Sequence, residues 1–399
     1  MGKAKIKRKH FWEYLIINIF VFVGIFFLSF IVLNVSIFDT FTQAFRDFTL
    51  TDLYYSKVVN QDKIYNGPLV LVNLENRNRI ELALLLEKLE EGTPKVIGID
   101  AIFPERKDSS DSLLRQVIVA NKNIIIPYIA SFSNQLPETR SDPYFETNSN
   151  SFVNLVGERN EFSTIRYYYP KFNKLSAFTT EIIKAYDSTL ARQLEKRNEK
   201  KTEIKYYGNL QNFVYHNYDE VMDPSFPTSV LKNKIILLGY FGLSAIKDKS
   251  TLDEDRFFTP LNPRLSGRSL PDMYGVIIHA NILRMALDKD YIFVFPSWLN
   301  FSLAFFLSWL LMPLFVNWFV HKALWFSLFS MFFQLFVSIL FLYSTILLYA
   351  YANVKIESSV LLVSVVLIGD FISFYNHIIK FLKYKLKWNF HSKLFEVAH

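Results

Sequence analysis

Four long apolar stretches dominate the hydrophobic pattern of this chain. They cover residues 15–33, 298–320, 323–351 and 358–379. The first three contain no Asp, Glu, Lys or Arg, and the fourth is interrupted by Asp370. Each stretch is long enough to cross about 30 Å of hydrocarbon at ~1.5 Å per residue. A helix of this length in a soluble core normally keeps a polar face, so we predict four transmembrane helices.

The segment between the first two stretches, residues 35–296, alternates strand-like and helix-like runs. Continuous apolar runs over 69–74, 95–103, 123–130 and 234–241 predict strands that are buried on both faces. Shorter strands are predicted over 151–156, 165–170 and 203–208. This pattern predicts an α/β domain with a layered mixed sheet, joined to the four transmembrane helices.

Helical periodicity fills the gaps between these strands. Apolar residues spaced three and four apart predict a helix over 79–90. Further helices are predicted over 110–120, with Ser110 or Asp111 as the N-cap, over 174–186, and from about Tyr274 onward. The polar run 188–201 predicts an exposed helix or loop.

Composition strengthens the membrane interpretation and removes several kinds of chemistry. The 399 residues are 51% hydrophobic and 17% aromatic, which is too apolar for an ordinary soluble protein. The chain has no cysteine. Disulfides, thiolate metal sites, a cysteine nucleophile and a lipoprotein anchor are therefore excluded.

The net charge of +7 is concentrated beside the apolar stretches. Basic residues gather in 1–14 and in 380–399, and the positive-inside rule places both segments in the cytoplasm. Residues 35–296 are then exported, and residues 15–33 are predicted to be an uncleaved anchor in a bacterial inner membrane. Because the positive charge follows topology, we do not expect a nucleic-acid partner.

Four motifs of the predicted exported domain follow one another in a familiar order. They are "VIGIDAIFPE", "KIILLGYFG", "FFTPL" and "YGVIIHANILRMAL". This order resembles the CHASE2 family, the extracytoplasmic sensor modules of bacterial membrane receptors. Family members likewise have one transmembrane helix before the domain and three after it. The resemblance implies a sensor of the periplasm that works in signal transduction.

Two features depart from the family pattern. Family members commonly continue into a kinase, cyclase or other output domain, whereas only residues 380–399 follow the last apolar stretch here, too few to fold alone. The family often has an Asp-Gly turn before an Arg in the middle of the domain. Arg166 matches that Arg, but the Asp-Gly is absent. The loop before Thr259 is lengthened, so Asp248, Asp253 and Asp255 remain alternatives for the family's acid.

Asp100 raises the question of function most directly. It ends a predicted buried strand, where α/β sheets commonly bind ligands. The alternative, which we favour, is a structural carboxylate that accepts backbone N–H groups or pairs with Arg166 or His279. His279 and Asn281 lie two residues apart on a predicted helix, and we favour separate buried hydrogen bonds for them. The candidate ligand-binding residues are Asp100, Arg166, Thr259, His279 and Asn281.

No motif indicates catalysis or a cofactor. HExxH, GxGxxG, GxxxxGK[ST] and GxSxG are all absent from the sequence. We therefore expect no catalytic residues, no metal site, no cofactor and no enzyme activity. A weaker hypothesis is an enzyme that uses Asp100 and His279.

Asp370 lies near the middle of the last apolar stretch. An acid at that depth costs at least about 2.5 kcal/mol and normally finds a partner or faces the bundle interior. We predict that Asp370 and Gln334 couple the transmembrane helices, and Gly369 allows close helix approach. The alternatives are contact with a partner subunit, a switch in helix packing, or an internal hydrogen bond to Gln334, Ser338 or Asn317.

These features favour a sensor or scaffold that binds an unidentified ligand or envelope protein and signals to a separate partner. The alternative function is a non-sensing structural subunit of a cell-envelope or secretion complex. Expected partners are a second copy of the chain or another membrane protein. Anionic lipid is expected at the basic termini, although the tail could also dock the partner.

Overall fold

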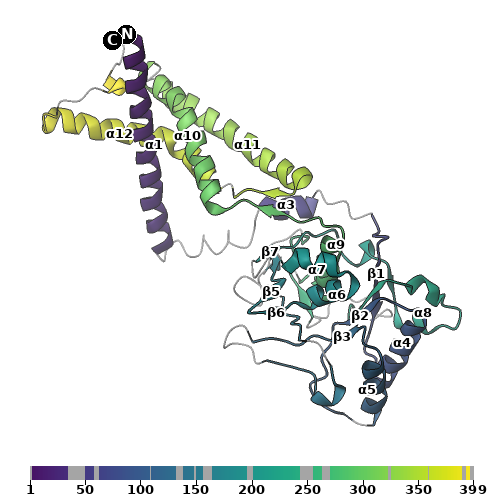
Figure 1. Ribbon diagram of the computed structural model, residues 1–399. Coiled ribbons are helices and arrows are strands. Elements are labelled where there is room, and N and C mark those ends of the chain that lie inside the picture. The colour runs from purple at the N-terminus through teal and green to yellow at the C-terminus, as the bar shows by residue number, and fades with distance from the viewer. Residues whose placement is uncertain are drawn as a thin grey trace. The chain divides into compact units, whose positions relative to one another are not determined.

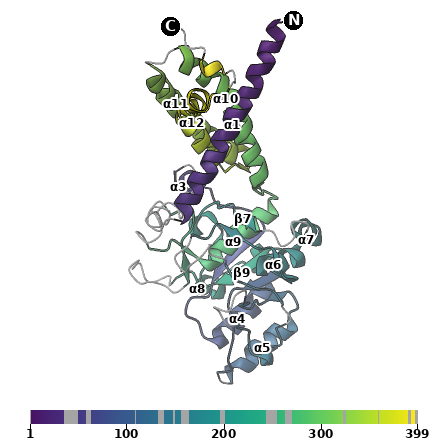
Figure 2. The same ribbon diagram turned by 90° about the vertical axis from the view of Figure 1, so that its left-hand side faces the viewer.

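A computed structural model describes most of the chain, and it divides into two compact units, residues 47–292 and residues 1–46 with 293–399. Figures 1 and 2 show both units in two views. The described residues are 2–34, 50–57, 63–107, 109–131, 138–147, 150–155, 164–195, 201–242, 255–262, 270–321, 325–357, 359–388 and 392–395.

A five-stranded sheet forms the centre of unit 47–292. Its order is β3-β2-β9-β1-β8, and every neighbouring pair is parallel. The sequence pattern predicts a mixed sheet, but this five-stranded sheet is parallel throughout. The strand last in sequence lies in the middle. The bounds are β1 (Leu69–Asn73), β2 (Val96–Ile99), β3 (Ile124–Ile125), β8 (Tyr215–His216) and β9 (Ile235–Gly239).

Helices cover both faces of this sheet, which explains why its strands are continuously apolar. On one face lie α4 (Arg79–Glu91), α5 (Ser110–Ala120) and α8 (Tyr218–Met222), packed on strand residues such as Val70 and Val72. The strand residues Leu69 and Leu71 are fully buried on the other face. That face carries α6 (Phe178–Tyr186), α7 (Ser188–Glu195) and α9 (Gly275–Leu287) (Figure 1).

The helix over Arg79–Glu91 has the predicted position and a capping box at Asn78, whose side chain accepts from the Glu81 N–H. The predicted N-cap of α5 is wrong. Ser109 occupies that position without a side-chain cap bond. Asp111 is instead fully buried and forms an ion pair with Arg79. A carboxylate removed from water needs such a partner.

Several predicted elements are shorter in the structure. Residues 175–176 form a strand, so α6 begins only at Phe178. In the described part of the run 151–156, Phe152 forms isolated bridges to Tyr128 and Ala177 instead of a strand. The helix α7 is not simply exposed, because Leu190 and Leu194 are buried. The remaining elements are α3 (Leu50–Lys57), β4 (Tyr167–Tyr168), β5 (Lys171–Phe172), β6 (Leu175–Ser176), β7 (Thr202–Glu203), β10 (Arg256–Phe257), β11 (Met273–Tyr274), η2 (Pro143–Phe145), η3 (Leu210–Asn212) and η4 (Thr228–Leu231).

The other unit is a bundle of four helices, each long and apolar enough to cross a membrane. They are α1 (Gly2–Asn34), α10 (Ser297–His321), α11 (Phe326–Ala352) and α12 (Ser359–Lys385). The helix α12 packs against each of the other three (Figure 2). The sequence pattern did not predict one internal polar contact: buried Asn18 donates to the Phe305 carbonyl over 3.1 Å and accepts from Ser308 over 2.8 Å.

Different short elements pack at the two ends of the bundle. At one end, β12 (Phe293–Val294), just before α10, pairs with β13 (Val354–Lys355), between α11 and α12. At the other end, η5 (Lys393–Phe395) folds back on the start of α1, where the Lys393 N–H donates to Glu13 over 3.0 Å. The start of α1 and the tail after α12 therefore lie together, opposite the entry to α10.

Candidate functional site

The carboxyl ends of β2, β9 and β1 meet at one edge of the sheet. The Asp100 N–H donates to the Leu238 carbonyl over 2.8 Å, and the Leu74 N–H donates to the Gly239 carbonyl over 2.9 Å. Asp100 therefore follows directly on β2, beside the end of the central strand. In open α/β sheets, ligands bind outside this edge.

Asn73, the last residue of β1, fixes the loop that leaves β9. Its side-chain amide donates to the Gly242 carbonyl over 2.8 Å, and its Oδ1 accepts from the Phe241 N–H over 3.2 Å. Gly242 has a φ of 100°, a conformation that glycine adopts without strain. Sequence reasoning missed Asn73, although a polar residue at the end of an apolar strand was a readable signal.

The first turn of α9 closes the same edge. A Cβ atom on Gly239 would lie 2.6 Å from the Val276 side chain, so the glycine allows the helix to approach the strand. The Asp255 carbonyl accepts from the Gly275 N–H over 3.2 Å, which brings Asp255 to the start of α9. The other two alternatives for the family's acid, Asp248 and Asp253, lie outside the described residues.

Asp100 and Asp255 are two carboxyls with raised pKa values. Burial raises the pKa of Asp100 to about 8, and the charge of Asp255 contributes to the rise. Loss of water around the carboxylate raises the pKa of Asp255 to about 6, even though part of that residue is exposed. Near neutral pH the pair can thus present one protonated carboxyl and one carboxylate. No side chain or N–H among the described residues bonds to the Asp100 carboxyl.

Arg166 pairs with Asp52. Pairing with Arg166 was one of the alternatives for a structural Asp100, and the structure does not show it. Its Nη2 lies 2.7 Å from Oδ2 of Asp52, and its Nε lies 3.1 Å from Oδ1. Only 4% of the Arg166 side chain and 7% of the Asp52 side chain are exposed. The partner comes from α3, more than a hundred residues earlier in the sequence, where no local pattern indicates it.

Thr259 is likewise bound to an acid of the same domain, by hydrogen bonds instead of an ion pair. Its Oγ1 donates to the Asp272 carboxylate over 2.5 Å and its N–H donates over 2.8 Å. Burial raises the pKa of Asp272 to about 6, while these hydrogen bonds act in the opposite direction. Thr259 is itself buried, so its hydroxyl holds the chain before α9 and does not face a crevice.

His279 and Asn281 lie within α9 and are buried. The Asn281 Oδ1 accepts from the Tyr207 N–H over 2.7 Å, and its amide donates to the Gly208 carbonyl over 3.0 Å. His279 meets Phe178 edge to face at 5.6 Å, and burial lowers its pKa to about 4, so the ring is neutral. Among the described residues nothing bonds to its Nδ1. Pairing of His279 with Asp100 was another of the alternatives, and it is not found among these residues.

The sequence matches the family model of the CHASE2 domain over residues 17–315. This chain belongs to the CHASE2 family. The match runs from α1 through the whole α/β domain into α10, and so includes the sheet edge described above. No curated protein and no solved structure matches the chain. CHASE2 is an extracellular sensory domain family, and the four apolar helices are those of a membrane protein.

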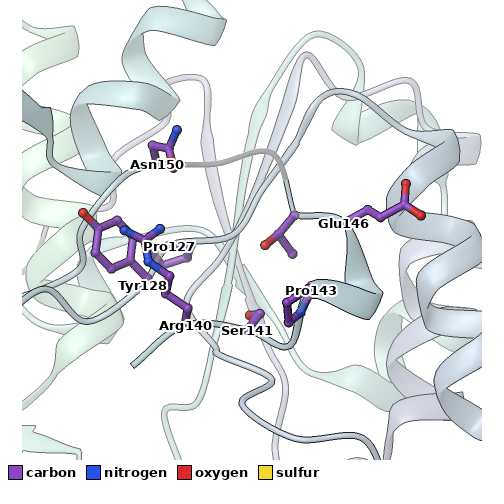
Figure 3. Close-up of a pocket in the computed structure, with 8 residues that line it drawn as sticks. Pro127, Tyr128, Arg140, Ser141, Pro143, Glu146 and Asn150 are labelled. Carbon is purple, nitrogen blue, oxygen red and sulfur yellow. The ribbon is translucent and has the colours of Figure 1, made fainter. Parts of the chain in front are cut away.

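The CHASE2 domain also contains a separate pocket of about 300 Å³ beyond β3. Figure 3 shows Arg140 beside Tyr128, with Pro143 and Glu146 across the pocket. The Arg140 guanidinium lies 3.6 Å from the centre of the Tyr128 ring and pairs with Glu138, while Glu146 pairs with Arg115. Because its charged groups are already paired, this pocket is a weaker candidate than the sheet edge.

Of the two residues expected to couple the transmembrane helices, the structure buries neither fully. Gln334 packs on α12, with its Nε2 3.2 Å from the place where a Cβ of Gly369 would lie. This close approach at Gly369 agrees with the prediction. Asp370 is exposed on the opposite side of α12. It makes none of the expected hydrogen bonds to Gln334, Ser338 or Asn317.

Proposed function

We propose that this CHASE2 protein is a bacterial inner-membrane sensor that binds a ligand at the carboxyl edge of its sheet. Membership of a sensory domain family carries the proposal. The helices of the bundle would pass the bound state to a separate partner protein. Such signalling requires a ligand whose affinity differs between two states of the protein.

The chemistry of the edge favours a ligand with an amino group. Burial disfavours the ionised form of both Asp100 and Asp255, and the charge of Asp255 adds to the effect at Asp100. An ammonium group between them would stabilise both carboxylates. The N-terminus of α9 and the loop held by Asn73 lie at the same edge and would border such a ligand. In this proposal the domain binds its ligand and has no catalytic role.

A binding experiment on the full-length protein in lipid nanodiscs tests this proposal, with ethanolamine and putrescine as probes. We expect an amine to raise the Tm of the wild type and to do so much less for Asp255→Asn. Glu87→Gln removes the same charge from an exposed position on α4 and should respond like the wild type. Hydrogen exchange should show protection at the start of α9 and a changed rate in α10–α12. Binding that leaves the exchange of these helices unaltered would favour the structural-subunit alternative.

The proposed orientation places the α/β domain in the periplasm and both termini in the cytoplasm. The bundle supports this, because the start of α1 and the tail after α12 share one end. The cysteine-free chain allows a direct test. A cysteine at exposed Ser188 should react with an impermeant maleimide in cells whose outer membrane has been made permeable, whereas one at exposed Lys385 should react only after lysis. The reverse labelling pattern would invert the topology.

A further inference from the structure

The outer surface of α12 carries an exposed acid, Asp370. The helix faces its neighbours in the bundle with one side, whose members are Leu361, Ser364, Val365, Ile368, Gly369, Ile372, Asn376 and Ile379. Asp370 lies on the other side and is exposed. No hydrogen bond or ion pair joins Asp370 to the rest of the described chain.

The surroundings of Asp370 in a membrane make this exposure costly. An acid at the middle of a transmembrane helix costs at least about 2.5 kcal/mol when it meets hydrocarbon. The expected internal donors do not offset this cost. Ser338 has an unbonded hydroxyl, and Gln334 packs against Gly369 on the buried side of α12. Cover for Asp370 must therefore come from outside the four-helix bundle.

Asp370 belongs to a continuous exposed stripe along α12. Val363, Asp370, His377 and Tyr384 recur at seven-residue intervals, and all four are exposed. We call this set, together with the adjacent exposed residues Val366, Phe374 and Phe381, the α12 stripe. A seven-residue repeat is the spacing at which two parallel helices stay in contact over several turns.

We propose that the α12 stripe is the interface between two copies of this chain, in which the two Asp370 carboxyls hydrogen-bond to each other. Two copies with the same orientation in a membrane are related by an axis along its normal, so each stripe residue meets its own equivalent. One carboxyl in its protonated form donates, and the other accepts. A polar residue at such a position fixes register and the number of chains. This interface does not depend on the proposed sensor function.

The stripe favours a second copy over a different protein for a physical reason. Val363, Phe374 and Tyr384 pack well against identical side chains, and an acid pairs with its own equivalent by sharing a proton. His377 already uses Nδ1 on the Ser373 carbonyl over 2.7 Å, so Nε2 is its remaining ring nitrogen for another hydrogen bond. A partner with a basic transmembrane residue is the competing explanation for Asp370.

Single cysteines provide the test, because the chain has none of its own. In native membranes treated with copper phenanthroline, Val363→Cys and Phe374→Cys should give disulfide-linked dimers. Leu340→Cys, which is 53% exposed on α11, is the matched control and should not. In the Val363→Cys background, Asp370→Leu should reduce cross-linking about fivefold, the equivalent of roughly 1 kcal/mol for an intramembrane hydrogen bond. Asp370→Asn should keep most of it.

A charge exchange decides between a second copy and a basic partner. Differently tagged copies with Asp370 and Asp370→Lys should cross-link to each other more than two Lys copies do, since the acid and the ammonium then face one another. The proposal is overturned if stripe cysteines cross-link no better than Leu340→Cys, or if the mixed pair gains nothing. As a folding control, the α/β domain should keep its resistance to trypsin in every variant. A change in cross-linking is then not caused by misfolding.

Discussion

Replacing Arg166 with methionine is expected to lower the free energy of unfolding of the CHASE2 domain by about 3–5 kcal/mol, because the substitution leaves a buried charge without its partner. Arg166 and Asp52 are both nearly inaccessible and share two hydrogen bonds. Asp52 would remain in the low-dielectric interior, where an unpaired carboxylate is strongly unfavourable. Urea unfolding of the full-length protein, followed by the fluorescence of the domain's tyrosines, measures the effect.

Two further variants make the result specific. The double variant Arg166→Met with Asp52→Leu should recover much of the stability, since a buried ion pair can often be replaced by apolar groups of similar volume. Arg140→Met breaks the pair with Glu138, in which both side chains are almost half exposed, and should cost no more than about 1 kcal/mol. Equal losses in the free energy of unfolding for Arg166→Met and Arg140→Met would show that the buried ion pair contributes no more to stability than the exposed one.

Replacing Asp100 with asparagine is expected to stabilise the domain at pH 7. Burial raises the pKa of Asp100 from an ordinary value of 3.8 to about 8, so folding opposes ionisation of this group. The full shift would give ~4 kcal/mol at pH 7. Because Asp100 is partly exposed, we expect about 2 kcal/mol after allowing for solvent screening. The observation would also show that the wild type retains this acid against its own stability.

The pH dependence of folding stability tests the sign of the Asp100→Asn effect independently. A carboxyl with a raised pKa in the folded state contributes its full stability below pH 3.8, and that contribution is lost as the pH rises toward 8. The advantage of Asp100→Asn should therefore be absent near pH 4 and grow up to about pH 8. The pKa values of Asp272 and Asp255 are also raised, and that of His279 is lowered. These groups are present in both proteins, so their contributions largely cancel in the stability difference between variant and wild type. A variant less stable than the wild type at every pH would instead make Asp100 a structural carboxylate.

A stabilising Asp100→Asn would change how the sheet edge is understood. The sequence favoured a structural carboxylate with hydrogen-bond partners, and the described structure supplies none. An acid that costs stability at the carboxyl edge of a parallel sheet is more readily explained by a ligand than by packing. The other four candidate residues have internal roles or no ligand-facing contact: Arg166, Thr259, His279 and Asn281.

The sequence alone determined the features that depend on local periodicity. Long apolar stretches specify the four membrane helices, since length and hydrophobicity suffice for that prediction. The buried strands β1, β2 and β9, the helix α4 and the helix α9 followed from apolar runs and helical spacing. The order of four motifs was enough to indicate the family that the match over residues 17–315 then showed.

The tertiary structure alone decided which distant segments meet. No periodicity indicates that β9 inserts between β1 and β2, or that Asp52 pairs with Arg166. The same holds for Asp370: the sequence placed an acid at the right depth, but its direction depends on which side of α12 the other three helices cover. Hydrophobic patterning defines each element's buried face, whereas partner choice depends on packing among segments far apart in the chain. The structure pairs Asp52, Asp111 and Asp272 internally, whereas neither Asp100 nor Asp370 has such a partner among the described residues.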